Sequence, residues 1–253
     1  MFITVNAKKV LRIFLSAVAA AAALSALSRP ALSSAYLGYS LRRLPIYSVE
    51  TPDKRISITF DAAWGADKTA RIIDVLNANG IKATFFLVGF WIERYPDEVK
   101  ALDAAGMELG NHTENHPDMA RLTAAQMADQ LASVNRRLKE ATDKEVTLFR
   151  PPFGSYCDKL IETSAGLGLR VIQWDVDSLD WKDSKTSSIV ERVTKKVKNG
   201  SIILFHNNSD AVVDAIGIII PTLKNQGYEF VTVGKLVHDG DYYIDHTGRQ
   251  IKK

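Results

Sequence analysis

Two histidines four residues apart are the first feature of this sequence that could do chemistry. His112 and His116 stand in the segment Glu108 to Pro117, which reads Glu-Leu-Gly-Asn-His-Thr-Glu-Asn-His-Pro. Imidazole is the commonest metal ligand in proteins, and a pair at this spacing can hold one ion from two sides. The alternative is a helix surface with two solvated imidazoles, or one histidine that caps a turn. Two ligands do not make a metal site, so the interpretation depends on the side chains that the fold brings near them.

The elements that would position these histidines alternate regularly along the chain. β-rich runs, each followed by a segment with helical spacing of apolar residues, indicate βαβ units and a parallel sheet. Because the strands are nearly continuous apolar runs, we expect a closed or nearly closed barrel rather than an open sheet. The expected strands are 55–60, 82–88, 107–109, 146–149, 169–176, 201–205 and 228–233, and the expected helices are 67–79, 96–105, 123–140, 158–167, 186–198 and 210–226.

Five polar residues stand at or just after the ends of predicted strands: Asp61, His112, Arg150, Asp180 and His206. In a βα barrel the carboxyl ends of the strands converge on one face, where active sites are built. Taken singly, Asp61 also suits a helix cap, Arg150 a surface ion pair and His206 a hydrogen-bonded core histidine. Five such residues at the same end of the strands favour a functional site.

Composition narrows the class of protein. With 253 residues, 46% of them hydrophobic and 24% charged, the chain has the length of one large domain and the composition of a soluble globular protein. The net charge is +3 and no long basic run is present, so we expect no nucleic-acid partner, and we expect a monomer. The single cysteine, Cys157, excludes an internal disulfide. No known local signature ties a histidine to it, which favours a small half-buried side chain over a nucleophile.

The N-terminus has the pattern of an export signal. A basic stretch from Lys8 to Arg12 precedes a nearly unbroken apolar run, Ile13 to Leu27, which is short for a membrane span. Ser33-Ser34-Ala35 offers small residues for cleavage before Tyr36. The alternative is an uncleaved anchor, in which case this segment alone contacts the membrane. Either way we expect the working domain outside the cytoplasmic membrane.

The motifs at the strand ends resemble those of a known family, the polysaccharide deacetylases (NodB-homology domain, carbohydrate esterase family 4). The five ordered segments are Thr59-Phe60-Asp61, His112-Thr-Glu-Asn-His116, Arg150-Pro-Pro-Phe-Gly154, Asp177-Ser-Leu-Asp-Trp181 and Leu204-Phe-His206. The resemblance covers Arg55 to Val233. The sequence from Phe60 to Gly65, Phe-Asp-Ala-Ala-Trp-Gly, is most similar to that of the sporulation-associated, PdaB-like branch of the family. It implies an α/β fold, a distorted (β/α)7 barrel, and removal of N-acetyl groups from a cell-wall glycan such as peptidoglycan, or from chitin.

This resemblance sets the domain division that we expect. Residues 1–35 would be a signal peptide or anchor, 36–53 a polar connector extended over the surface, 54–236 the deacetylase domain and 237–253 a polar tail. The tail holds His238 and His246 among aspartates. A second metal site is one interpretation of it, and a solvated extension is the one that we favour.

The resemblance also implies an acid–base mechanism. Asp61 matches the family's general base, and Arg150 would hold its carboxylate ionised and oriented. His206 matches the general acid, with Asp180 as the partner that keeps its imidazolium available. Four residues would contact substrate: Phe153 through a backbone N–H as oxyanion donor, Trp181 and Leu204 as walls of a pocket for the acetyl methyl, and Trp64 either stacked on a sugar ring or buried.

The metal site departs from the family's pattern at one position. His112 and His116 would hold a divalent ion, Zn²⁺ before cobalt, nickel or manganese, that polarises the acetamide carbonyl and lowers the pKa of a bound water. The family usually carries a second aspartate after the base as third ligand, and here that residue is Ala62. Glu114 or Asp67 could substitute, but we expect Glu114 to point away and Asp67 to cap a helix. Three outcomes follow: deacetylation with a weakly bound metal, a shell completed by water or substrate, or glycan binding without catalysis.

Overall fold

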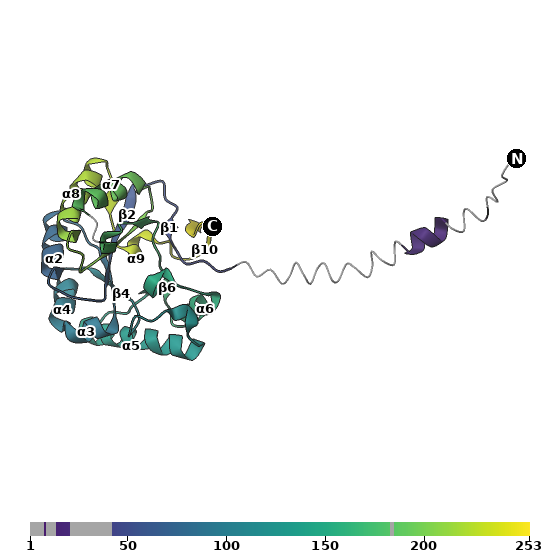
Figure 1. Ribbon diagram of the computed structural model, residues 1–253, viewed down its shortest axis with the longest axis horizontal. Helices are drawn as coiled ribbons and strands as arrows, with labels where there is room; N and C mark the ends of the chain where they lie inside the picture. The colour runs from purple at the N-terminus through teal and green to yellow at the C-terminus, as the bar shows by residue number, and fades with distance from the viewer. Residues whose placement is uncertain (1–7, 9–13, 21–41, 183–184) are drawn as a thin grey trace. The chain divides into compact units, whose positions relative to one another are not determined.

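The structure is a computed structural model that describes residues 8, 14–20, 42–182 and 185–253 (Figure 1). It divides into two units, residues 1–42 and 43–253, and residues 14–20 of the first are helical. No helix among the described residues combines the length and the apolar character needed to cross a membrane. The predicted cleavage site before Tyr36 lies outside the described residues, so the choice between signal peptide and anchor stays a prediction.

The second unit is built on a curled sheet whose strands pair in parallel throughout the described residues. Its order is β6 (Arg170–Val171), β5 (Leu148–Phe149), β4 (Glu108–Asn111), β3 (Thr84–Leu87), β2 (Arg55–Ala62), β8 (Ile202–His206) and β7 (Val176–Asp177), and β9 (Glu229–Phe230) pairs with the start of β2. The predicted parallel α/β architecture is confirmed.

The helices cover the outside of this sheet (Figure 1). They are α2 (Thr69–Ala78), α3 (Gly89–Arg94), α4 (Pro96–Ala104), α5 (Ala124–Thr142), α6 (Asp158–Gly166), α7 (Thr186–Lys196) and α8 (Val212–Asn225). The short α9 (Val233–Leu236) packs instead in a core cluster with Phe86 of β3, and the 3₁₀ turns are η1 (Met119–Arg121), η2 (Pro152–Gly154) and η3 (Asp180–Lys182). The α5 helix shows why sequence predicts such elements. Thr123 and Gln126 form a reciprocal capping box at its start, and one buried apolar stripe, Met127, Leu131, Val134 and Leu138, faces the core.

The central strand β2 separates an apolar face from a polar one. Its apolar residues Ile56, Ile58 and Phe60 belong to the largest core cluster, and its polar residues Ser57, Thr59 and Asp61 alternate with them. Because successive side chains of a strand point to opposite faces, the polar residues line the inner face of the curled sheet. There the Thr59 hydroxyl donates to the Ile203 carbonyl at 2.7 Å. This polar row ends at Asp61 and leads to the site.

The predicted elements missed α3, and the predicted strand 228–233 is only β9, followed by α9. Two further details are wrong. The expected strand 169–176 is interrupted because its backbone changes partner: Ile172 donates to Phe149, Gln173 donates to Ile46, and Asp175 donates to Ile202. The α2 helix begins at Thr69 without a side-chain cap. Asp67 therefore caps no helix; its carboxylate lies 2.9 Å from Lys68 Nζ.

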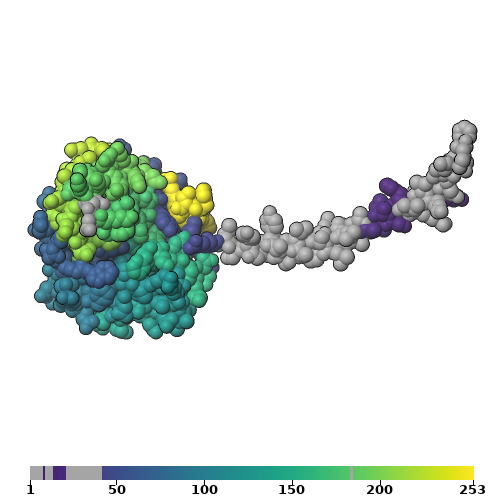
Figure 2. Space-filling model, viewed as in Figure 1, coloured from purple at the N-terminus to yellow at the C-terminus, as the bar shows by residue number. Residues whose placement is uncertain are grey.

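The segments that precede and follow the main sheet in the sequence form a second, smaller sheet. In it β1 (Ser48–Val49) pairs in parallel with β11 (Arg249–Lys252), which pairs antiparallel with β10 (Tyr242–Ile244). Figure 2 shows the yellow C-terminal residues against the dark blue residues that begin this unit. Val49 is buried, and a Cβ on Gly200, whose φ is +79°, would collide with the Val49 carbonyl oxygen. Glycine is therefore required where the connector crosses the loop before β8.

This small sheet corrects the predictions for both end segments. The connector is not simply extended over the surface, since Ile46 and Val49 lie in the interior. The tail is not a solvated extension, since Gln250 is fully buried and its side chain accepts from His238 N at 2.8 Å and donates to His238 O at 3.0 Å. The His238 ring is hydrogen-bonded to the Glu50 carbonyl, and no three metal-ligating side chains gather anywhere in the described residues. The second metal site considered for the tail is thus not formed there.

Candidate active site

Asp61 and Arg150 form a buried ion pair at the centre of the site. Arg150 is fully buried, and its Nη1 donates to Asp61 Oδ1 at 2.7 Å and to Thr59 Oγ1 at 2.8 Å. Its Nη2 donates to the Gln173 carbonyl at 3.1 Å. Burial by itself would raise the pKa of Asp61, but the positive charge and hydrogen bond of Arg150, together with His206, more than offset it, so the pKa lies below its ordinary value. Asp61 is therefore a carboxylate at neutral pH.

His112 directly follows β4 and faces this carboxylate. Its Nδ1 lies 2.7 Å from the Arg150 carbonyl, which can only accept, so Nδ1 carries the proton and Nε2 presents a lone pair. That Nε2 lies 3.6 Å from Asp61 Oδ2. The rings of His112 and His116 meet edge to face with centroids 4.9 Å apart. Burial lowers the pKa of both, that of His116 to about 4, so both are neutral near pH 7.

His206 and Asp180 form the second charged pair. Asp180 accepts twice from the same residue, from His206 N and from His206 Nδ1, both at 2.8 Å. Burial alone would lower the pKa of His206, but the hydrogen bond and charge of Asp180 raise it above the ordinary histidine value. Because Nδ1 faces Asp180, Nε2 is the atom left to carry a transferable proton.

Strand register brings the two pairs together. Asp61 and His206 are direct partners on the adjacent parallel strands β2 and β8. On the other side, His112 N donates to the Leu87 carbonyl at 3.0 Å and Arg150 N donates to the Asn111 carbonyl at 2.9 Å. The five residues predicted to converge at the strand ends therefore do so.

Two of the predicted substrate residues, Phe153 and Trp64, contact His116, and the other two, Trp181 and Leu204, lie close in sequence to Asp180 and His206. Phe153 is 71% exposed, and its ring lies edge to face with His116 at 4.7 Å; Trp64 is 57% exposed and meets the same imidazole at 5.0 Å. Trp64 is thus not buried, which corrects that alternative. Trp181, on η3, is 54% exposed with Lys182 Nζ 4.7 Å from its ring centroid. Leu204 is buried and shares a strand face with His206, two residues away on β8.

Comparison with known proteins settles the family. The sequence model described as polysaccharide deacetylase matches residues 48–172. A peptidoglycan-N-acetylglucosamine deacetylase of Bacillus cereus is 35% identical over 196 residues, which cover 76% of this chain and 92% of that protein. The chain belongs to the polysaccharide deacetylase family.

Its relatives include both an enzyme and a pseudoenzyme. A carbohydrate esterase family 4 pseudoenzyme from Bacillus anthracis is 34% identical, with a TM-score of 0.74 over 76% of this chain and 68% of that one. A mutant of that protein with restored enzymatic activity gives the same TM-score at 35% identity. These likenesses confirm the expected (β/α)7-type fold. The chain spans 62% of YlxY, an uncharacterised Bacillus subtilis protein that is 31% identical over 200 residues.

A polysaccharide deacetylase metal site is only partly provided by these residues. His112 and His116 are neutral and suited to a cation, but Ala62 offers a methyl group that is 1% exposed. Neither proposed substitute replaces it, because Glu114 is engaged by Arg137 at 3.0 Å and Asp67 is mostly exposed beside Lys68. Throughout the described part of the chain, no three histidine, cysteine or acidic side chains are placed to hold a metal ion. The residues therefore do not fit a three-ligand catalytic metal.

Sequence reasoning missed several residues that shape this family site. The Thr59 hydroxyl and the Gln173 carbonyl both accept hydrogen bonds from the Arg150 guanidinium. The polar alternation of Ser57, Thr59 and Asp61 is a signal that could have identified Thr59 as an inner-face residue. No pattern marks Gln173, whose role depends on the change of backbone partner after β6.

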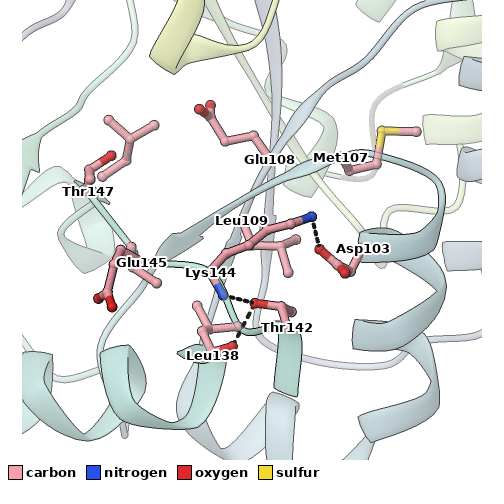
Figure 3. Close-up of a pocket in the computed structure, with 11 residues that line it drawn as sticks. Asp103, Met107, Glu108, Leu109, Leu138, Thr142, Lys144, Glu145 and Thr147 are labelled. Atoms are coloured by element: carbon pink, nitrogen blue, oxygen red, sulfur yellow. Dashed lines mark hydrogen bonds and ion pairs between the residues drawn. The ribbon is translucent and has the colours of Figure 1, made fainter. Parts of the chain in front are cut away.

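Two hollows among the described residues lie away from the acid–base site. One, of about 110 Å³, is lined by Glu108 at the start of β4, the opposite end from His112, and by Asp103 and Lys144, which pair across it (Figure 3). Another, of about 320 Å³, is lined mainly by apolar residues, among them Ile46 and Tyr242. Neither contains a residue of the acid–base site.

Proposed function

We propose that this chain hydrolyses the N-acetyl groups of a cell-wall glycan. The observation that carries the proposal is the lateral pairing of Asp61 with His206, each held by its own partner of opposite charge, Arg150 and Asp180. Amide hydrolysis needs a base for water and an acid for the departing amine, and the two groups stand in the protonation states that these tasks require.

The reaction begins at Asp61. Its carboxylate takes a proton from water, and the hydroxide adds to the acetamide carbonyl carbon. The Phe153 backbone N–H is our proposed donor to the resulting oxyanion. His206 Nε2 then gives its proton to the amide nitrogen as the C–N bond breaks, releasing acetate and a free amine.

Trp64, Trp181 and Leu204 are our proposed glycan contacts. Trp64 and Trp181 are exposed aromatic side chains beside the acid–base pairs, and a sugar ring can stack on such a face. Leu204, on the strand face of His206, would contact the acetyl methyl. The named activity of the Bacillus cereus relative supports peptidoglycan as the polymer. The sequence from Phe60 to Gly65 supports a role in sporulation, because it resembles that of the sporulation-associated branch. The export-type N-terminus supports action outside the cytoplasmic membrane.

Two histidines without a third ligand suit a weakly held cation, for which Zn²⁺ is our first candidate. The same observation favours a second function, glycan binding without catalysis. Ala62 removes a ligand that the family usually has, and the chain is 34% identical to a pseudoenzyme of the same fold. In that case the acid–base pairs would serve to bind the sugar rather than to hydrolyse it.

Acetate release from N-acetylated peptidoglycan and chitin fragments separates the two functions. We would compare the full chain with Asp61→Asn and His112→Ala, each stripped of metal and then supplied with Zn²⁺. Release that Asp61→Asn lacks would support the enzyme, and a further dependence on Zn²⁺ and His112 would support the cation. Folded protein that binds these glycans but releases no acetate under any condition would support the binding function.

A further inference from the structure

The loop that carries both histidines has a strained backbone. In this histidine loop, residues 111–117, Thr113 and His116 have φ values of 71° and 55°, a region that side chains other than glycine rarely adopt. Such conformations persist when surrounding contacts hold them. Two bonds within the loop do so: Asn111 Oδ1 accepts from Thr113 N at 2.8 Å, and Thr113 Oγ1 accepts from His116 N at 3.0 Å.

The α5 helix holds the same loop from outside. Asn111 Nδ2 donates to the Leu131 carbonyl at 2.8 Å, and Asn115 N donates to Gln130 Oε1 at 2.9 Å. Arg137, seven residues after Gln130, lies on the same face of the helix two turns further on. The helix therefore presents a polar edge to the loop beside its buried apolar stripe.

Arg137 makes the charged contact of this edge. Its Nη2 and Nε donate to the two carboxylate oxygens of Glu114, at 3.0 and 3.3 Å, and its Nη2 also lies 3.4 Å from Glu93 on α3. The Glu114 side chain is only 16% exposed. It packs directly over Gly89, where a Cβ would collide with the carboxylate, and Gly89 N donates to the Thr113 carbonyl at 2.9 Å. Glu114 is thus enclosed between α3 and α5, with Arg137 as its main counter-charge.

We propose that Arg137 is a positioning residue for the site: through Glu114 it sets the placement of His116 relative to His112. The proposal's catalytic consequence rests on the deacetylase function, but its structural consequence does not. Without Arg137, the sheltered Glu114 carboxylate loses its cation and turns toward water, and the adjoining backbone relaxes from its strained conformation. The imidazole of His116 then leaves its contact with His112.

The imidazole resonances of the two histidines test this directly. We would record them by NMR for the full chain, assign them with His112→Ala and His116→Ala, and compare Arg137→Gln with Arg137→Lys. Arg136→Gln is the matched control, since Arg136 is exposed on the same helix. We expect Arg137→Gln to displace or broaden the His116 signals, Arg137→Lys to restore most of the wild-type positions, and Arg136→Gln to leave them unchanged. The kcat for acetate release should fall about tenfold to a hundredfold in Arg137→Gln, since small misplacements of reacting groups cost this much.

A folded Arg137→Gln protein with wild-type His116 signals would overturn the proposal. If that variant does not fold, Glu114→Gln removes the charge with little change in size and should displace the same signals; unchanged signals there would overturn it equally. If the wild-type chain releases no acetate, the proposed enzyme fails, while the resonances still decide the role of Arg137.

Discussion

Among its neighbours, Asp180 does most to keep the general acid His206 protonated, and this gives a test at the scale of a single residue. Asp180 raises the pKa of His206, so the imidazolium survives to higher pH than a free histidine would. In Asp180→Asn that support is lost while burial continues to lower the pKa. We expect the alkaline limb of the kcat–pH profile to move to lower pH, with the acid limb, set by Asp61, little changed.

The same pair has a stability signature with a defined sign. A histidine whose folded pKa is raised contributes stability below its unfolded pKa and loses it as pH rises through the folded value. The loss of unfolding free energy in Asp180→Asn should therefore be largest in acid and shrink toward alkaline pH. Urea unfolding at several pH values measures it, and a defect that grows with pH would contradict this role of Asp180.

Position 62 determines how well the site can hold a cation. Ala62 follows the base directly, and its strand neighbour Leu87 accepts a hydrogen bond from His112 N at 3.0 Å. A carboxylate at residue 62 would add a charged oxygen ligand to the two imidazoles. We expect Ala62→Asp to lower the Kd for Zn²⁺ at least about tenfold, which corresponds to about 1.4 kcal/mol.

Calorimetric titration of the metal-free protein with Zn²⁺ gives this Kd. Ala62→Asn is the matched control, because it supplies an oxygen of similar size without the charge. An affinity in Ala62→Asp no higher than in the wild type would show that position 62 does not limit cation binding.

At the residue scale, the sequence predicted the acid–base residues and their direct partners, Arg150 and Asp180, but not the contacts that hold the histidine loop. Asp61, His112 and His206 could be found because each stands at or just after the end of a strand, and the strand ends of a parallel barrel meet. The ion pair of Glu114 with Arg137 could not be found in the same way. Its partners are 23 residues apart, and their contact depends on how α5 is rotated against the loop.

At the scale of elements, Arg150 joins the long central strand β2 to two short strands, β5 and β6, at the edge of the sheet. β5 contributes only Leu148 and Phe149 to the sheet, yet the arginine that follows it contacts Thr59 and Asp61 on β2 and the Gln173 carbonyl after β6. These contacts cross the inside of the curled sheet. Arg150 thus supports the fold as well as the base.

Removing this cation should therefore destabilise the protein strongly. In Arg150→Met the buried Asp61 carboxylate loses its partner, and we expect a loss of about 3–5 kcal/mol of unfolding free energy at neutral pH. Burial, no longer opposed by Arg150, should raise the pKa of Asp61, so the defect should shrink as pH falls and the carboxyl takes up a proton. Urea denaturation at neutral and acid pH tests both parts. A loss below about 1 kcal/mol would assign the stability of this region elsewhere.

Elements with local signals were predictable and those with distant causes were not. α5 has its cap and its apolar stripe within its own sequence, and it forms nearly where expected. The run 169–176 has the apolar character of one strand, but it is divided because Gln173 and Asp175 take partners from two other segments. The partner of Gln173 is Ile46, far upstream in the sequence, and the partner of Asp175 is Ile202, downstream. A local sequence pattern contains neither contact.

At the scale of the whole unit, the first and last strands of the domain pair with each other, β1 with β11. The connector, residues 36–53, and the tail, residues 237–253, are predicted from their polar composition to lie at the surface. Their small sheet nevertheless buries Val49 and Gln250 fully. Tyr47 packs over Gly248, where a Cβ would collide with its ring. Contacts of this kind depend on the meeting of the chain ends, which composition does not reveal.

Deleting residues 240–253 tests the weight of this small sheet. The deletion removes β10 and β11, leaves β1 unpaired on that side and exposes Val49, while the acid–base residues on β2 and β8 keep their own contacts. We expect a loss of a few kcal/mol, equivalent to a Tm lower by about 5–10 °C for a domain of this size. Acetate release, or glycan binding if the chain has no activity, should be retained well below the new Tm.

Gln250→Ala, which removes one buried hydrogen-bonding side chain, should show a smaller fall of Tm in the same thermal scan. A truncated chain with the wild-type Tm would mean that the tail contributes no stability despite its pairing. A chain that loses glycan binding while still folded would mean that the small sheet also shapes the site. It would do so from a distance, because the small sheet contacts the start of β8 and the acid–base residues lie at the carboxyl ends of β2 and β8.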